Sequence, residues 1–425
     1  MKISSICYKF ILPFFLVVCM TNCVFADDIL PLEDDFDISG ILSDIESIET
    51  DSNIAQEPTI NSRAYVVIDR KSNTILIGKN ENQKKKMAST TKIMTALIVI
   101  EHTNLSDTVE ISKKAASTGG SRLGLKTGDK ISVSDLLYGL MMRSGNDAAV
   151  ALAEYVSGSI SNFAELMNHK ALELGLSNTH FVTPHGLDED EHYTTAYELA
   201  ILSNYALHNE IFAKIVGTKD YTILINGYPK ALTNTNELLG GLNGVYGIKT
   251  GFTNGANRCL VTACKRGDMD IICVVLGADT KKYRTTDSIK LIEYAFHNFT
   301  YVNIEEMISN DFETWKKNNL NSFVIHKGKS NNLDLNYETI PYPMIPIRND
   351  LVNKFNIFIT HNRDLDAPIY KNTSIGKITL ELENKIIYSG NIIIYNEIQK
   401  KTILDYLSYF VKNFANIFNH CIYGL

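Results

Sequence analysis

Residues 87–101 read MASTTKIMTALIVIE, and this stretch indicates the fold of the central part of the chain. From Ser89 onward it is apolar nearly all round, which is typical of a helix that is buried on every side. Ser89 and Lys92 form an S-x-x-K pattern in its first turn. Because residues three apart on a helix share one face, we expect the hydroxyl and the amine to lie one turn apart. A lysine in apolar surroundings can serve as a base, so the stretch predicts a nucleophile–base pair.

Strand and helix patterns on both sides of this stretch predict an α/β domain over residues 63–302. Two β-rich runs around a Lys-Ser-Asn turn give a hairpin signal at residues 64–78. A hairpin at the start, helices in the middle and strands at the end imply one sheet that is assembled from distant segments and packed on helices. Helical periodicity occurs at residues 134–143, 147–156, 160–174, 194–208 and 286–299, and strand-like runs occur at 245–249, 258–265 and 269–277.

The composition changes after this domain. Residues 303–398 are rich in Asn and Ile in short alternating runs, which predicts a separate, small all-β domain. In residues 402–425, Ile403, Leu407, Phe410 and Phe414 recur at helical spacing among polar residues. We expect an amphipathic helix that lies on a membrane surface, with a helix docked on its own domain as the alternative.

The N-terminus carries a targeting signal. Two lysines precede the apolar residues 10–20, and Val-Phe-Ala at 24–26 is a small-residue cleavage pattern, so residues 1–26 are predicted to be a signal peptide. The apolar run is short for a retained membrane anchor, and Thr21-Asn22 before Cys23 disfavours a lipoprotein. We therefore expect an exported protein that works at the outer face of the cytoplasmic membrane or in the cell wall.

Residues 27–62 contain eleven acidic residues and no Lys or Arg, and they account for the net charge of −7. Such a stretch is typical of a flexible, solvated segment, and an acidic docking motif is the alternative. Elsewhere no basic face or aromatic-interleaved basic run occurs, so nucleic-acid binding is not expected. Three of the seven cysteines lie in the signal peptide, and there is no HExxH or paired metal-ligand spacing. We predict no metal and no cofactor.

Two further motifs lie in settings that suit acyl-transfer chemistry. Ser144-Gly145-Asn146 falls between two predicted helices, where a loop can bring a hydroxyl and an amide beside the Ser89 helix. The string Lys-Thr-Gly at 249–251 ends a predicted strand, whose edge can pair with an extended peptide. The strings at 374–377, 389–391 and 126–128 repeat the three patterns in unsuitable settings, so we interpret them as chance matches.

The order of the three motifs resembles that of penicillin-binding proteins and serine β-lactamases. Beyond the motifs, the chain resembles the low-molecular-mass penicillin-binding proteins that act as D-alanyl-D-alanine carboxypeptidases, in residues 87–101, 136–154, 192–200 and 244–266. The resemblance is strong over about 63–300 and looser in the β domain and the terminal helix. It implies an antiparallel sheet packed with helices, a peptidoglycan stem peptide ending in D-alanyl-D-alanine as substrate, and β-lactam antibiotics as inhibitors. One departure is Asn257 after Ala256, at the edge of the site.

The resemblance also implies roles for the motif residues. Ser89 would be the acylated nucleophile and Lys92 its general base. Ser144 would relay a proton to the leaving amine, and Asn146 would support the substrate and the dyad.

Substrate binding would fall to the late strand. Lys249 and Thr250 would bind the terminal carboxylate beside Gly251. The backbone N–H groups of Ser89 and Phe252 would form the oxyanion hole.

Three alternatives stay open. A serine β-lactamase shares the motifs, but its deacylating glutamate has only Glu165 as a candidate, inside a helical pattern. A non-catalytic wall-binding protein would not need all three motifs. An endopeptidase or transpeptidase would use the same acyl-enzyme, because the motifs do not specify the leaving group or the acceptor. His192 and Tyr193 match a family stretch, and we interpret them as a structural element at a helix start. The sequence does not determine the oligomeric state.

Overall fold

The computed structural model describes residues 56–423, and it describes the side chains of the last helix as far as residue 415. The predicted signal peptide and most of the acidic segment lie outside the described residues. The chain divides into two compact units between His297 and Asn298.

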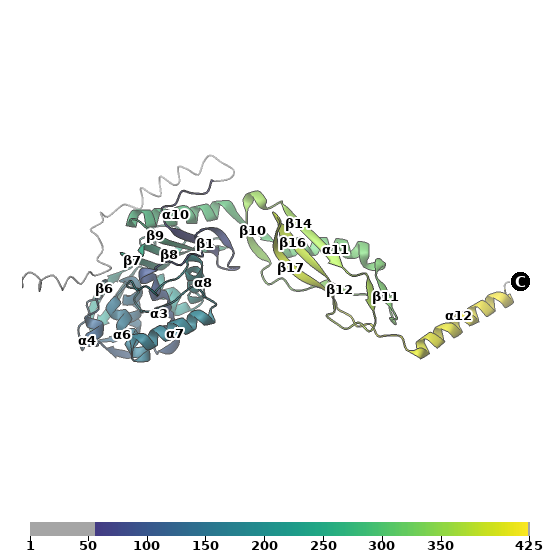
Figure 1. Cartoon of the computed structure of the whole chain (residues 1–425), viewed down its shortest axis with the longest axis horizontal. Coiled ribbons are helices and arrows are strands. Elements are labelled where there is room, and N and C mark those ends of the chain that lie inside the picture. The colour runs from purple at the N-terminus through teal and green to yellow at the C-terminus, as the bar shows by residue number, and fades with distance from the viewer. Residues whose placement is uncertain (1–55, 424–425) are drawn as a thin grey trace, which may run out of the picture. The chain divides into compact units, whose positions relative to one another are not determined.

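The first unit is built on a five-stranded antiparallel sheet in the order β2-β1-β9-β8-β7 (Figure 1). β1 pairs with β9 over its whole length, from Ala64 opposite Leu276 to Asp69 opposite Ile271, so the N-terminal hairpin joins strands from the end of the unit. This agrees with the sheet expected from distant segments. The strands are β1 (Ala64–Asp69), β2 (Ile75–Lys79), β7 (Val245–Thr253), β8 (Asn257–Arg266) and β9 (Met269–Ala278).

In Figure 1 the sheet lies between α10 and a group of helices that includes α3, α6 and α7. The predicted helical stretches form α5, α6, α7, α8 and α10, with shifts of a few residues at their ends. The helices are α3 (Lys92–His102), α4 (Lys113–Ala116), α5 (Val133–Met142), α6 (Asn146–Ser157), α7 (Ile160–Glu173), α8 (Ala196–Ala206), α9 (Glu210–Val216) and α10 (Lys281–Asn298), with the 3-10 turn η1 (Ala88–Thr91) directly before α3.

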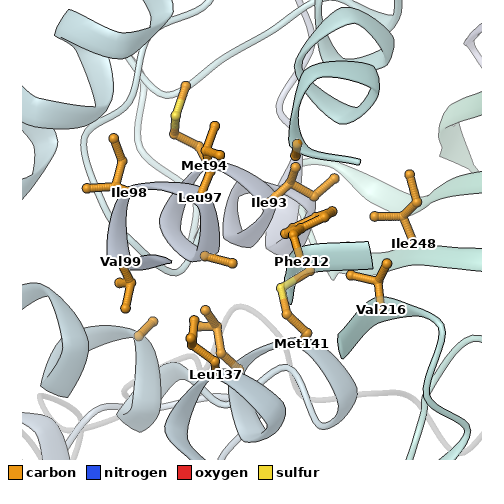
Figure 2. Close-up of a cluster of buried hydrophobic side chains, with 14 of the residues drawn as sticks. Ile93, Met94, Leu97, Ile98, Val99, Leu137, Met141, Phe212, Val216 and Ile248 are labelled. Carbon is orange, nitrogen blue, oxygen red and sulfur yellow. The ribbon is translucent and has the colours of Figure 1, made fainter. Parts of the chain in front are cut away.

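The helix α3 is the centre of the helical core. Its side chains from Lys92 to Val99 are all buried, which agrees with the apolar sequence on every face. Figure 2 shows its apolar side chains among those of α5, α9 and β7. The surrounding residues are Leu137 and Met141 of α5, Phe212 and Val216 of α9, and Ile248 of β7.

A smaller antiparallel sheet with the order β3-β4-β5-β6 completes the first unit. The sequence analysis did not predict it, because two of its strands have only three residues. The strands are β3 (Thr108–Glu110), β4 (Lys130–Ser132), β5 (Asp220–Ile225) and β6 (Tyr228–Thr233).

The second unit contains a four-stranded sheet in the order β12-β17-β16-β14 and two strand pairs, β10–β13 and β11–β15. It is mostly β, as expected, but it also contains the helix α11, which the sequence analysis missed. Only Ile304, Ile308 and Phe312 of α11 are buried, and this narrow stripe is hidden among polar residues. Its elements are β10 (Phe299–Asn303), α11 (Ile304–Asn319), η2 (Leu320–Ser322), β11 (Val324–His326), β12 (Leu335–Tyr337), β13 (Met344–Arg348), η3 (Asn349–Leu351), β14 (Phe355–His361), β15 (Asp364–Asp366), β16 (Ser374–Leu382) and β17 (Lys385–Ile394).

The chain continues into the helix α12 (Ile403–Tyr423). Its large apolar side chains are exposed, among them Ile403 at 81%, Phe410 at 67% and Phe414 at 60%. In the part of the chain that the structure describes, no helix combines the length and the apolar character that crossing a bilayer requires.

Candidate active site

Ser89 and Lys92 lie together where η1 passes into α3. Both side chains are buried, and Lys92 Nζ lies 2.7 Å from Ser89 Oγ. The spacing of three residues therefore brings hydroxyl and amine into hydrogen-bond contact, as the S-x-x-K pattern predicts. Ser89 itself belongs to the tighter 3-10 turn rather than to the α-helix.

Two acceptors from distant parts of the chain also contact the Lys92 amine. Nζ donates to Asn146 Oδ1 at 2.7 Å and to the backbone carbonyl of His185 at 2.8 Å. Both partners are oxygens that can only accept. A neutral amine that donates to both keeps its lone pair for the Ser89 hydroxyl, which is the arrangement that a general base needs.

The Ser144–Asn146 motif joins α5 to α6, as expected for a loop between helices. Asn146 is the first residue of α6, and its Nδ2 donates to the carbonyl of Gly119 at 2.9 Å while its Oδ1 faces Lys92. Ser144 has a left-handed φ of 57°, and its buried Oγ has no hydrogen-bond partner among the described residues. A buried hydroxyl without a hydrogen-bond partner costs free energy, and a bound ligand could supply the missing hydrogen bond.

Lys249, Thr250 and Gly251 lie on β7, which is an edge strand of the five-stranded sheet. They do not end the strand as predicted, because β7 continues to Thr253. The hydroxyl of Thr250 is 2.8 Å from that of Thr235, and Lys249 donates to the carbonyl of Thr250 at 3.0 Å. A Cβ at Gly251 would lie 3.2 Å from the backbone nitrogen of Ser89. The glycine therefore allows β7 to pass directly against η1, and Phe252 follows it on the strand.

Lys249 is completely buried, and its surroundings act on its charge. Burial, together with the charge of Arg284, lowers the pKa of Lys249 to about 7. Arg284 comes from α10 and is itself buried, where it pairs with Glu237. Because Glu237 balances the charge of Arg284, the ammonium form of Lys249 is the cation on β7 that favours an anionic ligand.

Sequence reasoning missed several residues of this arrangement. Arg284 lies two residues before the helical pattern predicted over 286–299, because α10 begins earlier, at Lys281. His185 contributes a backbone carbonyl, which leaves no sequence signal. Asp147 is a buried carboxylate that accepts from the backbone N–H groups of residues 123–125 and so fixes the loop beside the Ser144–Asn146 motif. In the sequence, only its position directly after that motif indicates a role in the site.

The chance matches and the rival glutamate lie elsewhere. Residues 374–377, which repeat S-x-x-K, are in the strand β16 and not at the start of a helix. Residues 389–391, which repeat Ser-Gly-Asn, are in the strand β17 and not between two helices, and residues 126–128, which repeat Lys-Thr-Gly, are in a loop and not on a strand. Glu165 is exposed in the middle of α7. Among the described cysteines, Cys259, Cys264 and Cys273 are free and buried.

Comparisons with known proteins agree with this geometry. A family model described as D-alanyl-D-alanine carboxypeptidase matches residues 51–280. The chain is 33% identical over 364 residues to the D-alanyl-D-alanine carboxypeptidase DacF of Bacillus subtilis, covering 84% of this chain and 91% of the relative. It is 34% identical over 362 residues to DacC of Escherichia coli, covering 81% of this chain and 86% of the relative.

Solved structures show the same similarity. Penicillin binding protein 5 of Haemophilus influenzae matches with a TM-score of 0.65 at 30% identity, covering 81% of this chain and all of that one. The DD-transpeptidase of Streptomyces K15 matches with a TM-score of 0.55 at 34% identity, covering 57% of this chain and 99% of that one.

Proposed function

The protein belongs to the D-alanyl-D-alanine carboxypeptidase family of serine peptidases, and we propose that Ser89 is the nucleophile with which it removes the terminal D-alanine of peptidoglycan stem peptides. The family implies a peptide substrate that ends in D-alanyl-D-alanine and binding of β-lactams. The observation that carries the assignment of Ser89 is its 2.7 Å contact with Lys92, whose amine also donates to Asn146 and His185.

Acylation follows from the arrangement around the dyad. The Lys92 amine accepts the Ser89 proton while Oγ attacks the carbonyl carbon of the penultimate D-alanine. The N–H groups of Ser89 and Phe252 stabilise the resulting oxyanion. When the tetrahedral intermediate collapses, the peptide C–N bond breaks, and Ser144 donates its proton to the departing amine of D-alanine. The proton that Lys92 took from Ser89 then replaces it on the Ser144 oxygen, so Lys92 is again neutral. The unpartnered Ser144 hydroxyl supports this role, because the leaving nitrogen would give it a partner.

The terminal carboxylate of the substrate is bound by Lys249 and Thr250. The positive charge at this end of the site comes from the ammonium form of Lys249, because Glu237 balances the charge of Arg284. Deacylation then requires a water that attacks the ester and regenerates Ser89. No described feature places a glutamate for this water as a class A β-lactamase requires, because Glu165 is exposed on α7.

The test is mass spectrometry of the mature protein after brief exposure to benzylpenicillin, with Ser89→Ala as the matched control. We expect a long-lived adduct on the peptide that contains Ser89, absent in the variant, and release of D-alanine from an acyl-D-alanyl-D-alanine peptide by the parent protein alone. An adduct on another residue, or D-alanine release by the Ser89→Ala variant, would overturn the assignment. Rapid penicillin hydrolysis without an adduct would favour a β-lactamase.

A second activity at the same site is transfer of the acyl group to an amine. The similarity to the Streptomyces DD-transpeptidase favours it, since 99% of that protein matches 57% of this chain. Incubation with the peptide substrate and glycine as acceptor should then give a glycyl product beside free D-alanine. If only the hydrolysis product forms over a wide range of glycine concentrations, the site is a hydrolase alone.

We also propose that the protein is exported and that α12 holds it on the membrane surface. The large apolar side chains of α12 from Ile403 to Phe414 are exposed, and an interface would cover them. Phe410→Glu should weaken binding to vesicles of phosphatidylglycerol and phosphatidylethanolamine by about tenfold or more, because a buried aromatic side chain contributes roughly 1.5–3 kcal/mol. Ser408→Glu on the same helix is the control, and equal loss in both variants would contradict a defined apolar face.

A further inference from the structure

His192 lies behind the turn that carries Ser89, outside the three motifs. It is almost completely buried, and its Nε2 is 2.7 Å from the hydroxyl of Thr91. Its other ring nitrogen, Nδ1, accepts from the backbone N–H of Val182 at 2.9 Å. The ring also packs edge-on against Phe181, with centroids 5.8 Å apart. The imidazole is therefore held on three sides.

These contacts allow one tautomer of His192. Because Nδ1 accepts from a backbone N–H, the ring proton must be on Nε2. The hydroxyl of Thr91 donates its single proton to the carbonyl of Ala88 at 2.7 Å, so its oxygen is left to accept from Nε2. Burial lowers the pKa of His192 to about 3, with smaller contributions from nearby cations, so the ring stays neutral at ordinary pH. The result is a chain of hydrogen bonds with one direction, from Val182 through His192 and Thr91 to Ala88.

This chain of hydrogen bonds ends on the Ala88–Ser89 peptide unit, directly before the Ser89 side chain. The carbonyl of Ala88 and the N–H of Ser89 belong to the same trans peptide and point in opposite directions. Ala88 has a φ of 49°, a left-handed value that an alanine rarely adopts, so this unit needs support from its surroundings. Gly186 packs directly on it, since a Cβ there would lie 2.0 Å from the Ala88 oxygen. A hydrogen bond to that oxygen both fixes the peptide plane and makes the opposite N–H a stronger donor.

We propose that His192 is a positioning residue for the oxyanion hole: through the Thr91 hydroxyl it orients and polarises the Ala88–Ser89 peptide, whose N–H binds the oxyanion. This inference rests on the proposed role of Ser89. The contact with the oxyanion is made only in the tetrahedral state, so its loss lowers kcat and leaves KM nearly unchanged. Loss of a whole oxyanion-hole donor costs about 10²–10³ in kcat, and a weakened donor should therefore cost about 10- to 100-fold.

The turn η1 offers a matched pair of variants, at Thr91 and Thr90. Thr91→Val removes the hydroxyl and keeps the shape of the side chain. Thr90→Val does the same one residue earlier, where an equally buried hydroxyl donates to the carbonyl of Met87 at 2.6 Å, a peptide that does not contain the Ser89 N–H. With kcat expressed per Ser89 that benzylpenicillin can label, we expect a 10- to 100-fold loss for Thr91→Val and less than about twofold for Thr90→Val.

Variants of His192 test the other part of the hydrogen-bond chain. His192→Phe keeps a ring against Phe181 and removes both hydrogen bonds, so it should lower kcat as Thr91→Val does. The double variant should be no slower than either single variant, because both interrupt one chain. His192→Gln keeps an N–H within reach of Thr91 and should recover part of the loss. The pH profile of the surviving activity should keep its shape in all of them.

Three outcomes would overturn the inference. Equal losses in Thr90→Val and Thr91→Val would indicate general damage to the turn. Multiplied losses in the double variant would indicate two separate effects. A limb that disappears from the pH profile in His192→Phe would make His192 an acid–base group. Ser89→Ala separates these results from the proposed function: if that variant is inactive while every His192 variant matches the parent, only the positioning role fails.

Discussion

At the scale of single residues, the backbone and hydroxyl of Ser144 are both in unfavourable states. Its φ is 57°, and its buried Oγ has no hydrogen-bond partner among the described residues. Such local cost is typical of functional sites, where substrate or transition state supplies the missing contact. The Ser89–Lys92 dyad differs from Ser144 because its two side chains are already hydrogen-bonded to each other without substrate.

We expect Ser144→Gly to separate stability from activity. Glycine tolerates the left-handed conformation and leaves no buried hydroxyl, so the free energy of unfolding should rise by up to about 1 kcal/mol, even after the entropic cost of glycine. Acylation should fall by about 10²–10⁴ if the hydroxyl carries the proton to the leaving group. Urea unfolding and D-alanine release would measure the two effects. A variant that is both less stable and fully active would contradict this account of Ser144.

Lys249 gives a pH dependence whose direction follows from its burial. The ammonium form, which we propose binds the substrate carboxylate, predominates below a pKa of about 7, because burial and Arg284 lower that pKa from its ordinary value. For the free enzyme, kcat/KM should therefore fall as the pH rises through about 7. In Lys249→Arg the charge persists at all accessible pH values, so this alkaline limb should disappear even if overall activity is lower. An unchanged limb in Lys249→Arg would assign the titration to another group.

At the scale of elements, the packing of α3 holds the Ser89–Lys92 dyad in place. Its apolar residues fill the core on every face (Figure 2). Lys92 is its first residue, and Ser89 lies in the turn η1 directly before it. The rigid packing of this helix is what keeps the 2.7 Å dyad contact in place.

Leu97→Ala should test this support. Leu97 is 1% exposed, and truncation leaves a cavity in the core, so the free energy of unfolding should fall by about 2–5 kcal/mol. Leu172→Ala on α7 is the control, since that side chain is 73% exposed and its loss should cost less than roughly 0.5 kcal/mol. Chemical denaturation compares the two. Similar losses in both variants would show that the helices do not share one α3-centred core.

At the scale of the whole molecule, the two units have separate hydrophobic cores. One cluster of buried residues runs from Ala64 to Leu276, and the other runs from Ile304 to Ile398. Every residue assigned to the site, from Ser89 to Arg284, belongs to the first unit. The second unit therefore adds no side chain to the proposed chemistry.

We expect a chain that ends after Asn298 to keep its reaction with penicillin. Because the first core is complete without the second unit, fluorescent penicillin should label the shortened chain at Ser89 at a rate within a fewfold of the parent. Thermal unfolding of both chains, followed by circular dichroism, would check that the first unit remains folded. A shortened chain that is folded but unlabelled would show that the second unit contributes to the site.

Local sequence was enough to predict the α3 helix, the hairpin, the three late strands and the three motifs. These features can be recognised from residue periodicity and from spacings of two or three residues. In a helix or a strand, such spacings place side chains on the same face of the element. The membership of the five-stranded sheet could be inferred as well, because a hairpin at the start and strands at the end need common partners. The short strands of the small sheet and the helix α11 were missed because their patterns are too brief or too polar.

The surroundings of the dyad depend on contacts between residues far apart in the chain. Lys92 meets a carbonyl 93 residues away, and Thr91 meets His192 across 101 residues. A backbone carbonyl has no residue signature, and a buried histidine looks the same in the sequence whether it fills the core or orients a peptide. The charge state of Lys249 likewise depends on burial and on Arg284 from another helix. Only tertiary packing brings these groups together, because hydrogen bonding and desolvation act through space rather than along the chain.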